Sequence, residues 1–262
     1  MDKELQLLSA KYLKEYSRKS KISFPGLIKR LSAKKIYSAT DFEFYIQASA
    51  TYSSNIEGNS ISLNTYLKNK KFNIKSKPKE MAEIDDLMKA YNYAIENKLN
   101  SANLLKAHKI LSRNILSLPG QRGKLRNNPV GIYSAGKLEY LAVEPEYVNQ
   151  EFSKLFSDIN MLLECRLINK EIFYYASLVH LWFEKIHPFM DGNGRAGRLL
   201  EKWFLAEKIG KNAWSIQSEM YYAKNRAEYY KNIHIGFNYY ALKMERCIPF
   251  LVMLTKAMKK DG

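Results

Sequence analysis

Apolar residues recur at steps of three or four over most of this chain, the spacing that places side chains on one face of an α-helix. In the clearest stretch, one helix face carries Ile172, Ala176, Val179, His180, Phe183 and His187. The same spacing returns at Leu199, Leu200, Trp203 and Phe204. Because such faces are buried by packing helix against helix, the sequence predicts an all-α fold.

One segment, residues 119–145, interrupts the helical pattern. It is rich in proline, glycine and asparagine, with short apolar alternations on both sides of Ser134-Ala135-Gly136. Turn residues between two alternating runs are typical of a β-hairpin. We therefore expect one small hairpin in a helical bundle, with strands at Gly131–Tyr133 and Leu138–Ala142. A surface hairpin with no role in function is the alternative.

The lysine-rich segment Lys68–Lys79 is the best candidate for a loop near an internal boundary. We expect a helical subdomain at residues 1–99 and a larger core at residues 100–262, without a flexible linker between them. The last apolar stretch, Ile248–Met258, predicts a terminal helix and not the winged-helix pattern of a DNA-binding module.

The net charge of +16, from 42 basic and 26 acidic residues, raises the question of a nucleic-acid partner. The distribution argues against one, because the basic residues of 1–36 and Lys68–Lys79 are interleaved with apolar residues and are mostly lysines. Surfaces that bind phosphates depend more on the forked guanidinium of arginine. We expect a solvated basic surface, with acidic protein surfaces left open as partners. A nucleic-acid-binding regulator is the alternative from a different functional class.

No segment reaches the roughly 18 uncharged apolar residues that a membrane span needs, and Met1–Ser9 carries charges where a signal peptide would be apolar. We expect a cytoplasmic protein with no membrane partner. Cys165 and Cys247 are too few and too far apart for a disulfide framework or a thiolate metal site, which predicts two buried thiols.

The run from His187 to Arg198 reads His-Pro-Phe-Met-Asp-Gly-Asn-Gly-Arg-Ala-Gly-Arg and joins two predicted helices. Pro188 is expected to end the first helix near His187, and the glycines allow backbone angles closed to other residues. Phe189 is expected to anchor the loop in the core. Nothing in an ordinary packed core requires this mixture of a histidine, a carboxylate, glycines and arginines.

Gly192, Asn193 and Gly194 stand where the second helix begins, so their amides and the helix dipole can bind an anion. Arg195 and Arg198 follow in the first turns of that helix. Each can bond a different phosphate with a geometry that lysine does not offer. This part of the run is therefore interpreted as a phosphate-binding loop.

Asp191 at the loop entrance would be repelled by phosphates unless a divalent ion lay between them, and Mg²⁺ fits that need. His187, four residues earlier, can face the same phosphates and accept a proton from an incoming hydroxyl. The sequence thus predicts a general base beside a phosphate site. The alternative is a glycine-rich turn with a capping aspartate and surface arginines.

The same run resembles the signature of the Fic family, His-x-Phe-x-Asp/Glu-Gly-Asn-Gly-Arg-x-x-Arg, at every signature position. The resemblance implies a protein adenylyltransferase, which transfers AMP from ATP to a serine, threonine or tyrosine hydroxyl of a target protein and releases pyrophosphate. It implies that His187 deprotonates the hydroxyl, that Asp191 holds Mg²⁺, and that Arg195 and Arg198 bind the outer phosphates. The residues implied to bind the α- and β-phosphates are Gly192, Asn193 and Gly194.

A second match lies upstream, where Ser53-Ser54-Asn55-Ile56-Glu57-Gly58 resembles the family's inhibitory motif, Ser/Thr-x-x-x-Glu-Gly/Asn. It falls in a predicted helix at about residues 41–58. The resemblance implies a class II-like inhibitory helix in which Glu57 pairs with Arg198 and displaces the γ-phosphate. The alternative is an ordinary helix end, with Gly58 as the residue that follows the helix.

The predicted hairpin occupies the place of the family's flap, at about residues 124–145, which would hold a target segment by backbone pairing. Lys124-Leu125-Arg126 and Val130-Gly131-Ile132 resemble the first half of the flap, whereas Ala142–Glu146 keeps one proline of the second half. The resemblance thus implies a protein target, and leaves its identity and self-modification open.

Arg226-Ala-Glu-Tyr-Tyr230 resembles the family segment whose second tyrosine lies against the adenine base, which implies a stacking role for Tyr230. With 19 tyrosines in the chain, a core or surface tyrosine is the alternative. Phe237 stands where relatives often have an asparagine that contacts the base, so the nucleotide preference stays open. His180 is expected to be a hydrogen-bonded core residue, and His108 is given no chemistry.

Two other reactions stay open for the same site. One is removal of AMP from a modified target, with Glu57 placing a water molecule, and the other is transfer from a different nucleotide or phosphate donor. The oligomeric state is open as well, and a homo-oligomer is among the alternatives.

Overall fold

The computed structural model describes residues 4–33, 39–74, 76–134 and 136–259, and within them the predicted all-α fold with one small hairpin is confirmed. The α-helices are α1 (Leu13–Ser20), α2 (Phe24–Ala33), α3 (Ala39–Ile56), α4 (Leu63–Phe72), α5 (Pro78–Glu96), α6 (Ser101–Leu111), α7 (Pro145–Glu164), α8 (Asn169–Ile186), α9 (Asn193–Ile209), α10 (Ser218–Lys224), α11 (Arg226–Ile233) and α12 (Ile248–Ala257). The short 3₁₀ helices are η1 (Ala10–Tyr12), η2 (Pro119–Gln121), η3 (Lys211–Ser215), η4 (Tyr239–Ala241) and η5 (Met244–Arg246). The strands are β1 (Gly131–Ser134) and β2 (Lys137–Leu141).

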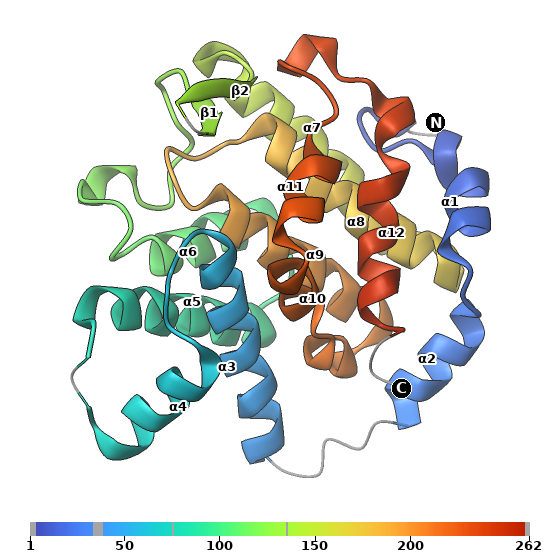
Figure 1. Ribbon diagram of the computed structural model, residues 1–262. Coiled ribbons are helices and arrows are strands. Elements are labelled where there is room, and N and C mark those ends of the chain that lie inside the picture. The colour runs from blue at the N-terminus through green and yellow to red at the C-terminus, as the bar shows by residue number, and fades with distance from the viewer. Residues whose placement is uncertain (1–3, 34–38, 75, 135, 260–262) are drawn as a thin grey trace.

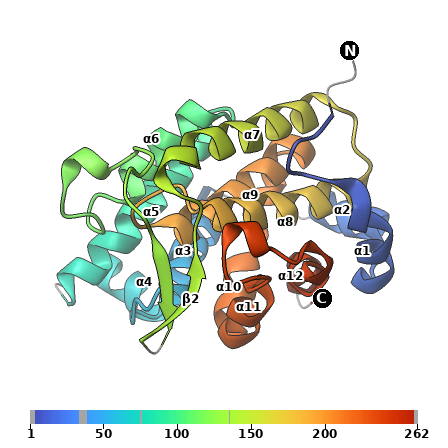
Figure 2. The ribbon, with the colours of Figure 1, turned by 90° about the horizontal axis from the view of Figure 1, so that it is seen from above.

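Helices α8 and α9 form the centre of the molecule and pack on each other along their lengths. Figure 1 shows α3, α4, α5 and α6 on one side of this pair and α1, α2 and α12 on the other, and Figure 2 shows the same order from above. Helix α9 contacts α3, α5 and α6, whereas α8 contacts α1, α2, α7 and α12. The loop from His187 to Arg198 therefore lies where the two central helices meet, in contact with both halves of the molecule.

The first described residues are tied to the centre of the fold. The Asp158 carboxylate on α7 accepts the backbone amides of Gln6, Leu7 and Leu8 at 2.7 to 2.8 Å. Helix α1 then packs on α8 and α12. Buried residues from both sides of the predicted boundary at residue 99 form one contiguous hydrophobic core, and the division into two units stays a prediction.

Helix α3 docks on α9 through polar contacts that repeat every four residues. Ser49 of α3 contacts Lys202 of α9, and Ser53 contacts Arg198. The two helices therefore run antiparallel. Lys202 Nζ donates to Ser49 Oγ and to Glu219 Oε2 of α10, both at 2.6 Å, and the Lys202 and Glu219 side chains are fully buried. Because a buried charge must keep its partner, α3 can dock only in the register that preserves these bonds.

The observed ends of both strands lie within one residue of the predicted ends. Strands β1 and β2 pair antiparallel with Ile132 opposite Tyr140, and the register shifts between Ile132 and Tyr133. Ala135, in the predicted turn, lies outside the described residues. Beyond the hairpin, Leu141 bridges to Asn238, so the base of β2 is anchored to the segment that follows α11.

The loop predicted at Lys68–Lys79 is wrong in its first part, because α4 extends to Phe72. Residues 73–77 separate α4 from α5, and Lys75 among them lies outside the described residues. Ser62 caps the start of α4 with its side-chain oxygen. Lysine has good helix propensity, so a charged run extends a well-capped helix instead of breaking it.

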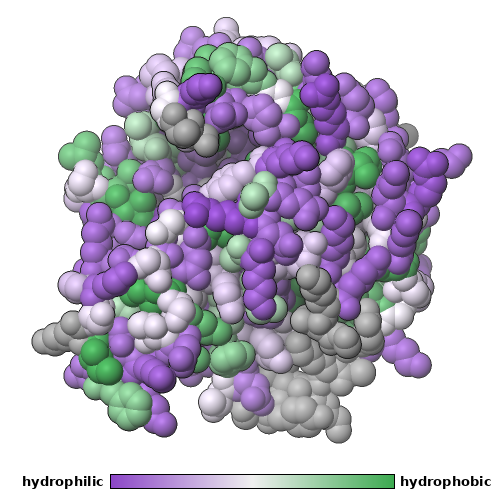
Figure 3. Space-filling view, viewed as in Figure 1, coloured by the Kyte–Doolittle hydropathy of each residue, from purple (hydrophilic) through white to green (hydrophobic). Residues whose placement is uncertain are grey.

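The described helices and surface were compared with the predictions about membrane spans and cysteines. No described helix combines the length and the apolarity that crossing a bilayer requires. Figure 3 shows hydrophilic side chains over most of the coloured part of one face, with apolar areas between them. Cys247 is buried as predicted, but Cys165 is exposed, so the prediction of a buried thiol is wrong there. Cys165 follows the last residue of α7, where the chain leaves the core.

The buried pair that supports α3 on α9 gives a stability prediction. Replacing Lys202 with methionine leaves the Glu219 carboxylate buried without its cation, and we expect a loss of about 3–5 kcal/mol in the free energy of unfolding. The double variant Lys202→Met/Glu219→Gln removes the stranded charge and should be more stable than Lys202→Met alone. Urea denaturation measures both. Losses that simply add up in the double variant would contradict a coupled pair.

Candidate active site

The loop between α8 and α9 starts with a residue in an unusual backbone conformation. Helix α8 ends at Ile186, and His187 follows it with φ of 51°, in the left-handed region that non-glycine residues seldom adopt. The His187 amide still donates to Phe183 O at 2.9 Å, which closes the last turn of α8. Gly192, with φ of 79°, makes the second sharp turn before α9 begins at Asn193. The sequence prediction of a helix-loop-helix at this run is confirmed.

Asn193 holds the loop together from inside. Its side-chain oxygen accepts the Phe189 amide at 2.9 Å, and its side-chain nitrogen donates to Phe189 O at 2.8 Å. The oxygen and the nitrogen of the Asn193 side chain thus both bond the backbone of Phe189. The Phe189 side chain is fully buried, as predicted. These contacts give the Asn193 side chain a loop-bracing role, and the part in phosphate binding that the resemblance implies for Asn193 stays a prediction. What the loop presents to an anion is its backbone amides, since the first amides of a helix lack helical acceptors.

His108 supports the loop from α6. Its ring stacks on Phe189 at a centroid distance of 3.5 Å, and its Nε2 donates to Asp191 O at 2.9 Å. The proton lies on Nε2 because Nδ1 accepts the Gly123 amide at 3.0 Å. Burial lowers the pKa of His108 to about 4, so the ring is neutral at pH 7. Sequence analysis assigned His108 no chemistry, whereas the structure shows that it supports the loop.

The predicted general base is neutral and has an unused ring nitrogen. Burial lowers the pKa of His187 to about 4, and the positive charges of Arg126 and Lys185 act in the same direction. Its Nδ1 is buried without a hydrogen-bond partner, 3.8 Å from the Glu184 carboxylate on the preceding turn. A neutral imidazole can accept a proton, which is what a general base must do.

Arg126 connects the hairpin to the loop. Its guanidinium donates from Nε to His187 O at 2.8 Å, and from Nη1 and Nη2 to the carbonyls of Asn128 and Val143, which flank the hairpin. Its own amide donates to Pro188 O at 2.9 Å. The side chain is buried, and every one of these acceptors is a carbonyl. Arg126 therefore fixes the position of the hairpin relative to His187.

The predicted pair of Glu57 and Arg198 is present. Arg198 Nη2 lies 2.7 Å from Glu57 Oε1, and the Arg198 side chain is 1% exposed against 28% for Glu57. Arg198 also donates from Nε to Ser53 Oγ at 2.9 Å, from Nη2 to Ser53 O at 3.0 Å and from Nη1 to the Tyr229 hydroxyl at 3.3 Å. Each of the three guanidinium nitrogens thus has a partner, and two of the partners belong to the α3 region.

Glu57 occupies the start of α9. A Cβ placed on Gly194 would overlap the Glu57 carboxylate, so glycine is required at Gly194 while Glu57 is in this position. Burial alone would raise the pKa of Glu57, but Arg198 and then Arg195 more than offset it, and the pKa is lowered. An ionised carboxylate therefore lies against the helix terminus that the sequence assigns to phosphate.

The turn that carries Glu57 is tied to α5. Gly58, with φ of 97°, turns the chain after α3. The Asn59 side chain then donates to Glu80 O at 2.9 Å, and the Ser60 amide donates to the Glu80 carboxylate at 2.6 Å. The alternative of an ordinary helix end is correct for Gly58, and it coexists with the ion pair.

Asp191 and Arg195 complete the loop. The Asp191 side chain is exposed and accepts the amide of Gly192. Within the described ranges no three His, Cys, Asp or Glu side chains gather at one point, so a cation here would need oxygens from a phosphate and water beside Asp191. Arg195, predicted to bind phosphate, has one nitrogen, Nη2, 3.2 Å from Glu83 Oε2 of α5.

Tyr230 lies at the rim of the site. Its ring is 41% exposed, Arg226 lies over it at 5.6 Å, and its hydroxyl donates to Ile56 O at 2.9 Å. The tyrosine thus holds the end of α3 while keeping a face open, and its stacking role stays a prediction. Phe237 is 53% exposed, and its carbonyl accepts the Leu141 amide at 2.9 Å.

A buried chain of hydrogen bonds lies behind Arg198. The Tyr229 hydroxyl that accepts from Arg198 is 3.1 Å from His180 Nε2, and His180 Nδ1 is 3.0 Å from Glu201 Oε2. The prediction of His180 as a hydrogen-bonded core residue is confirmed. Tyr229 was missed, although adjacent helical residues point in different directions, so one of Tyr229 and Tyr230 had to face the core.

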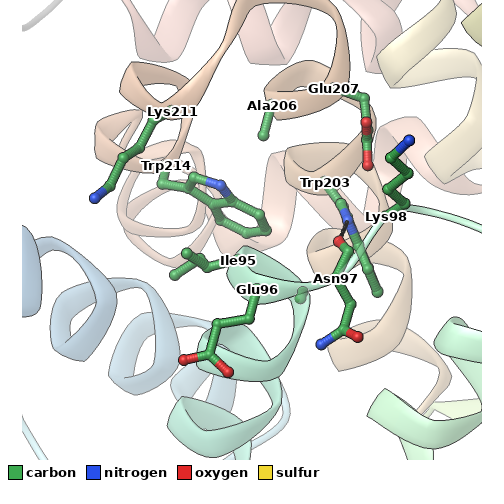
Figure 4. A pocket seen from close by; sticks show the side chains of 10 residues that line it. Ile95, Glu96, Asn97, Lys98, Trp203, Ala206, Glu207, Lys211 and Trp214 are labelled. Atoms are coloured by element: carbon green, nitrogen blue, oxygen red, sulfur yellow. Dashed lines mark hydrogen bonds between the residues drawn. The ribbon is translucent and has the colours of Figure 1, made fainter.

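A surface hollow lies elsewhere on α9. It has a volume of about 380 Å³ and contains the rings of Trp203 and Trp214, with Trp203 Nε1 donating to Asn97 O at 3.0 Å (Figure 4). Residues of this hollow come from the second half of α9, from η3, and from the end of α5 with the two residues that follow it. It is therefore separate from the loop at the start of α9.

Comparison with known proteins points to one family. Residues 98–205, which run from just before α6 to the middle of α9, match the model of the Fic/DOC family. The chain is 27% identical over 118 residues to protein adenylyltransferase fic-1 of Caenorhabditis briggsae. That match spans 45% of this chain and only 20% of the relative.

Solved structures share the fold over nearly the whole chain. A Fic family protein from Desulfovibrio desulfuricans G20 superposes with a TM-score of 0.77 at 19% identity, over 98% of this chain and 74% of that one. A Fic domain containing signaling protein from Bacteroides thetaiotaomicron VPI-5482 gives 0.68 at 17% identity, over 90% and 94% of the two chains. Fic-1 from C. elegans gives 0.66 at 18% identity, over 95% and 71%. At these identities the likeness is one of fold.

The lowered pKa of His187 predicts a pH effect on stability. The folded-state pKa of about 4 lies below the value of about 6.5 expected in the unfolded chain, so the unfolded state binds a proton first and stability falls as the pH drops from 7. At pH 5 the contribution of His187 to this loss is about 2 kcal/mol. In His187→Asn, which tolerates the left-handed backbone, the loss between pH 7 and pH 5 should be smaller by that amount. Urea denaturation at both pH values tests this, and an unchanged pH dependence in the variant would contradict it.

Proposed function

The chain is a member of the Fic/DOC family through its domain at residues 98–205, and on that premise we propose that it is a protein adenylyltransferase held at low activity by Glu57. The donor would be ATP, with Mg²⁺, and the acceptor a serine, threonine or tyrosine hydroxyl of a protein. The observation that carries the proposal is the arrangement of the His187–Arg198 loop. A neutral histidine lies at one end, and the amides and arginines of a helix start lie at the other.

In the proposed reaction, the acceptor oxygen attacks the α-phosphorus of ATP while His187 takes its proton. The new bond joins the acceptor oxygen to the α-phosphorus, and the bond from the α-phosphorus to the bridging oxygen of pyrophosphate breaks. Pyrophosphate carries away the electron pair. The α9 amides and Arg195 would stabilise the charge that develops on the phosphates, as preorganised donors do in a buried site.

Asp191 is the side chain that would hold Mg²⁺. Its carboxylate is exposed at the loop entrance, and the surrounding loop offers backbone amides that favour phosphate. The donor set fits an ion that takes only one or two protein carboxylates and completes its octahedron with phosphate oxygens and water. When bound, Mg²⁺ supplies positive charge that neutralises the donor's phosphates.

The Glu57 carboxylate supports the proposal of inhibition. It covers Gly194 and uses an Arg198 nitrogen that a terminal phosphate would otherwise bond. The Glu57 carboxylate lies over Gly194, in the space that a terminal phosphate beside Arg198 would take, and the two negative groups repel each other there. ATP would therefore have to displace Glu57 before its γ-phosphate could reach Arg198.

The hairpin supports a protein acceptor. Among the described residues β1 pairs with β2 alone, so its outer edge has backbone groups available for an extended target segment. Arg126 joins the hairpin to the carbonyl of His187. A target paired to β1 would thus be held in a defined position relative to the proposed base.

Removal of AMP from a modified target is the second candidate. The observation that favours it is the lowered pKa of Glu57, which gives an ionised carboxylate near His187 and Arg198 that could orient a water molecule. A purified AMP-modified substrate would separate the two reactions. Transfer from a nucleotide other than ATP is distinguished by labelled ATP, GTP, UTP and CTP in parallel.

Replacing Glu57 with glycine should increase AMP incorporation. The substitution frees Arg198 and the α9 amides, and we expect between about 5- and 150-fold more label, the usual range for a coupling of this kind. His187→Ala in the same background should remove nearly all of it, since a general base contributes about 10²–10⁴ in rate. Intact-mass analysis after incubation with ATP and Mg²⁺ detects self-modification, and tagged ATP in a cell lysate detects targets.

A matched control is Glu96→Gly, which removes an exposed carboxylate at the far end of α5. It should behave as the unmodified protein does. Equal AMP incorporation by the unmodified chain and Glu57→Gly would reject the inhibitory role, and no labelled product from either would reject the transferase.

Replacing Asp191 with asparagine should weaken Mg²⁺ binding without unfolding the loop, because the side-chain oxygen can still accept the Gly192 amide. In the Glu57→Gly background, we expect the Mg²⁺ concentration for half-maximal activity to rise by about 10- to 100-fold. A Mg²⁺ titration of labelled-AMP transfer measures this. An unchanged titration curve would place the ion elsewhere.

A further inference from the structure

Each arginine of the loop pairs with one carboxylate, and the two pairs differ in how they use the guanidinium. Arg198 bonds Glu57, which follows α3, and Arg195 bonds Glu83 on α5. We propose that Glu83 is a positioning residue that holds Arg195 ready for the donor's phosphates, so that its loss lowers activity where the loss of Glu57 raises it. This inference rests on the proposed function.

The count of free donors separates the two arginines. Arg198 already gives four of its five N–H donors to Ser53, Glu57 and Tyr229, which leaves one donor on Nη1 for an anion. Arg195 gives only Nη2 to Glu83, and its buried Nε has no partner among the described residues. Since a guanidinium has five N–H donors, Arg195 can bond an anion while it keeps Glu83.

The positions of the two carboxylates differ as well. Glu57 overlaps the space above Gly194 and so covers the start of α9. The atoms nearest to that space belong to Glu57 and Arg198, and Glu83 is not among them. Glu83 approaches from the body of α5 and leaves the amides open. It therefore orients a phosphate-binding side chain without filling the phosphate site.

Helix α5 gives Glu83 a fixed position. One turn earlier, Glu80 bonds the turn that follows Glu57, and α5 packs on α3, α6 and α9. The Arg195 side chain is 7% exposed and Glu83 15%, so the pair is shielded from water and its bond is stronger than a surface ion pair. Without Glu83, the Arg195 fork would lose its fixed orientation and a phosphate would have to order it on binding.

The test measures ATP binding and turnover in the Glu57→Gly background, where Arg198 is free. Adding Glu83→Ala should weaken ATP binding and lower kcat/KM by about 10- to 100-fold, the cost of a misplaced catalytic contact. Glu83→Gln, which can still accept the Arg195 bond, should recover part of the loss. Glu96→Ala, on the same helix, should change neither value, and thermal melting shows that each variant is folded.

A double-mutant cycle with Arg195 separates positioning from a general effect on folding. If Glu83 acts through Arg195, then adding Glu83→Ala to Arg195→Ala should cost little further ATP affinity. A full additional loss would overturn the inference. So would an increase in activity on replacing Glu83 in the chain that retains Glu57, because that would make Glu83 a second inhibitory carboxylate.

Isothermal titration with ATP distinguishes failure of the inference from failure of the proposed function. If Glu57→Gly binds ATP and Glu83→Ala leaves that affinity unchanged, the role of Glu83 is rejected and the transferase stands. If Glu57→Gly itself binds no ATP, the proposed function is rejected, and the role of Glu83 with it.

Discussion

A fully buried guanidinium, Arg198, is the constraint on which much of this structure depends. A cation removed from water must be matched by acceptors, because leaving it unpaired costs several kcal/mol. Ser53 and Glu57 supply most of that match, so helix α3 has to lie against α9. The serines of α3 are small enough to let the two helices approach and polar enough to accept from charged side chains. Packing of α3 and control of the loop are thus consequences of the same contacts.

This coupling limits how the site can be freed. Moving α3 away as a whole would also break the contact between Ser49 and Lys202, a fully buried lysine. Turning the Glu57 side chain alone breaks one ion pair at a residue that is already 28% exposed. The second route costs less free energy, because Arg198 is the one buried charge that loses a partner, and a phosphate would then bond it. A rearrangement confined to Glu57 and the turn after it is therefore the change that the fold permits most readily.

The features that could be predicted from the sequence are those set by residues close together in the chain. The helical period, the turn residues of the hairpin and the loop from His187 to Arg198 are local patterns, and the pairing of Glu57 with Arg198 came from a motif. The loop predicted at Lys68–Lys79 was wrong because a charged run says nothing against a capped helix. The bonds of the Asn193 side chain to Phe189 were not predicted, since an amide side chain serves a phosphate and a loop carbonyl equally well.

Long-range partners were beyond prediction for a different reason. Glu83, His108 and Arg126 lie on elements far from the loop in sequence, and nothing beside them in the chain marks them as its partners. A glutamate in an acidic helix looks like a solvated residue until the fold brings an arginine to it. The packing of α5 and α6 on α9 makes the contacts of Glu83 and His108, and the segment before β1 brings Arg126 to His187, so all three follow from tertiary structure and not from spacing.

Some of the buried polar atoms without a hydrogen-bond partner lie in the loop or beside it. Eight buried side-chain nitrogen and oxygen atoms of the described residues have no partner, and three of them, Glu184 Oε1, His187 Nδ1 and Arg195 Nε, belong to the loop or contact it. Native proteins leave few such atoms, because each costs free energy, so a cluster needs a reason. Burial raises the pKa of Glu184 and lowers that of His187, which brings both groups toward their neutral forms and reduces that cost. The unsatisfied atoms of the loop thus lie beside Arg198, which gives four of its five N–H donors to Ser53, Glu57 and Tyr229.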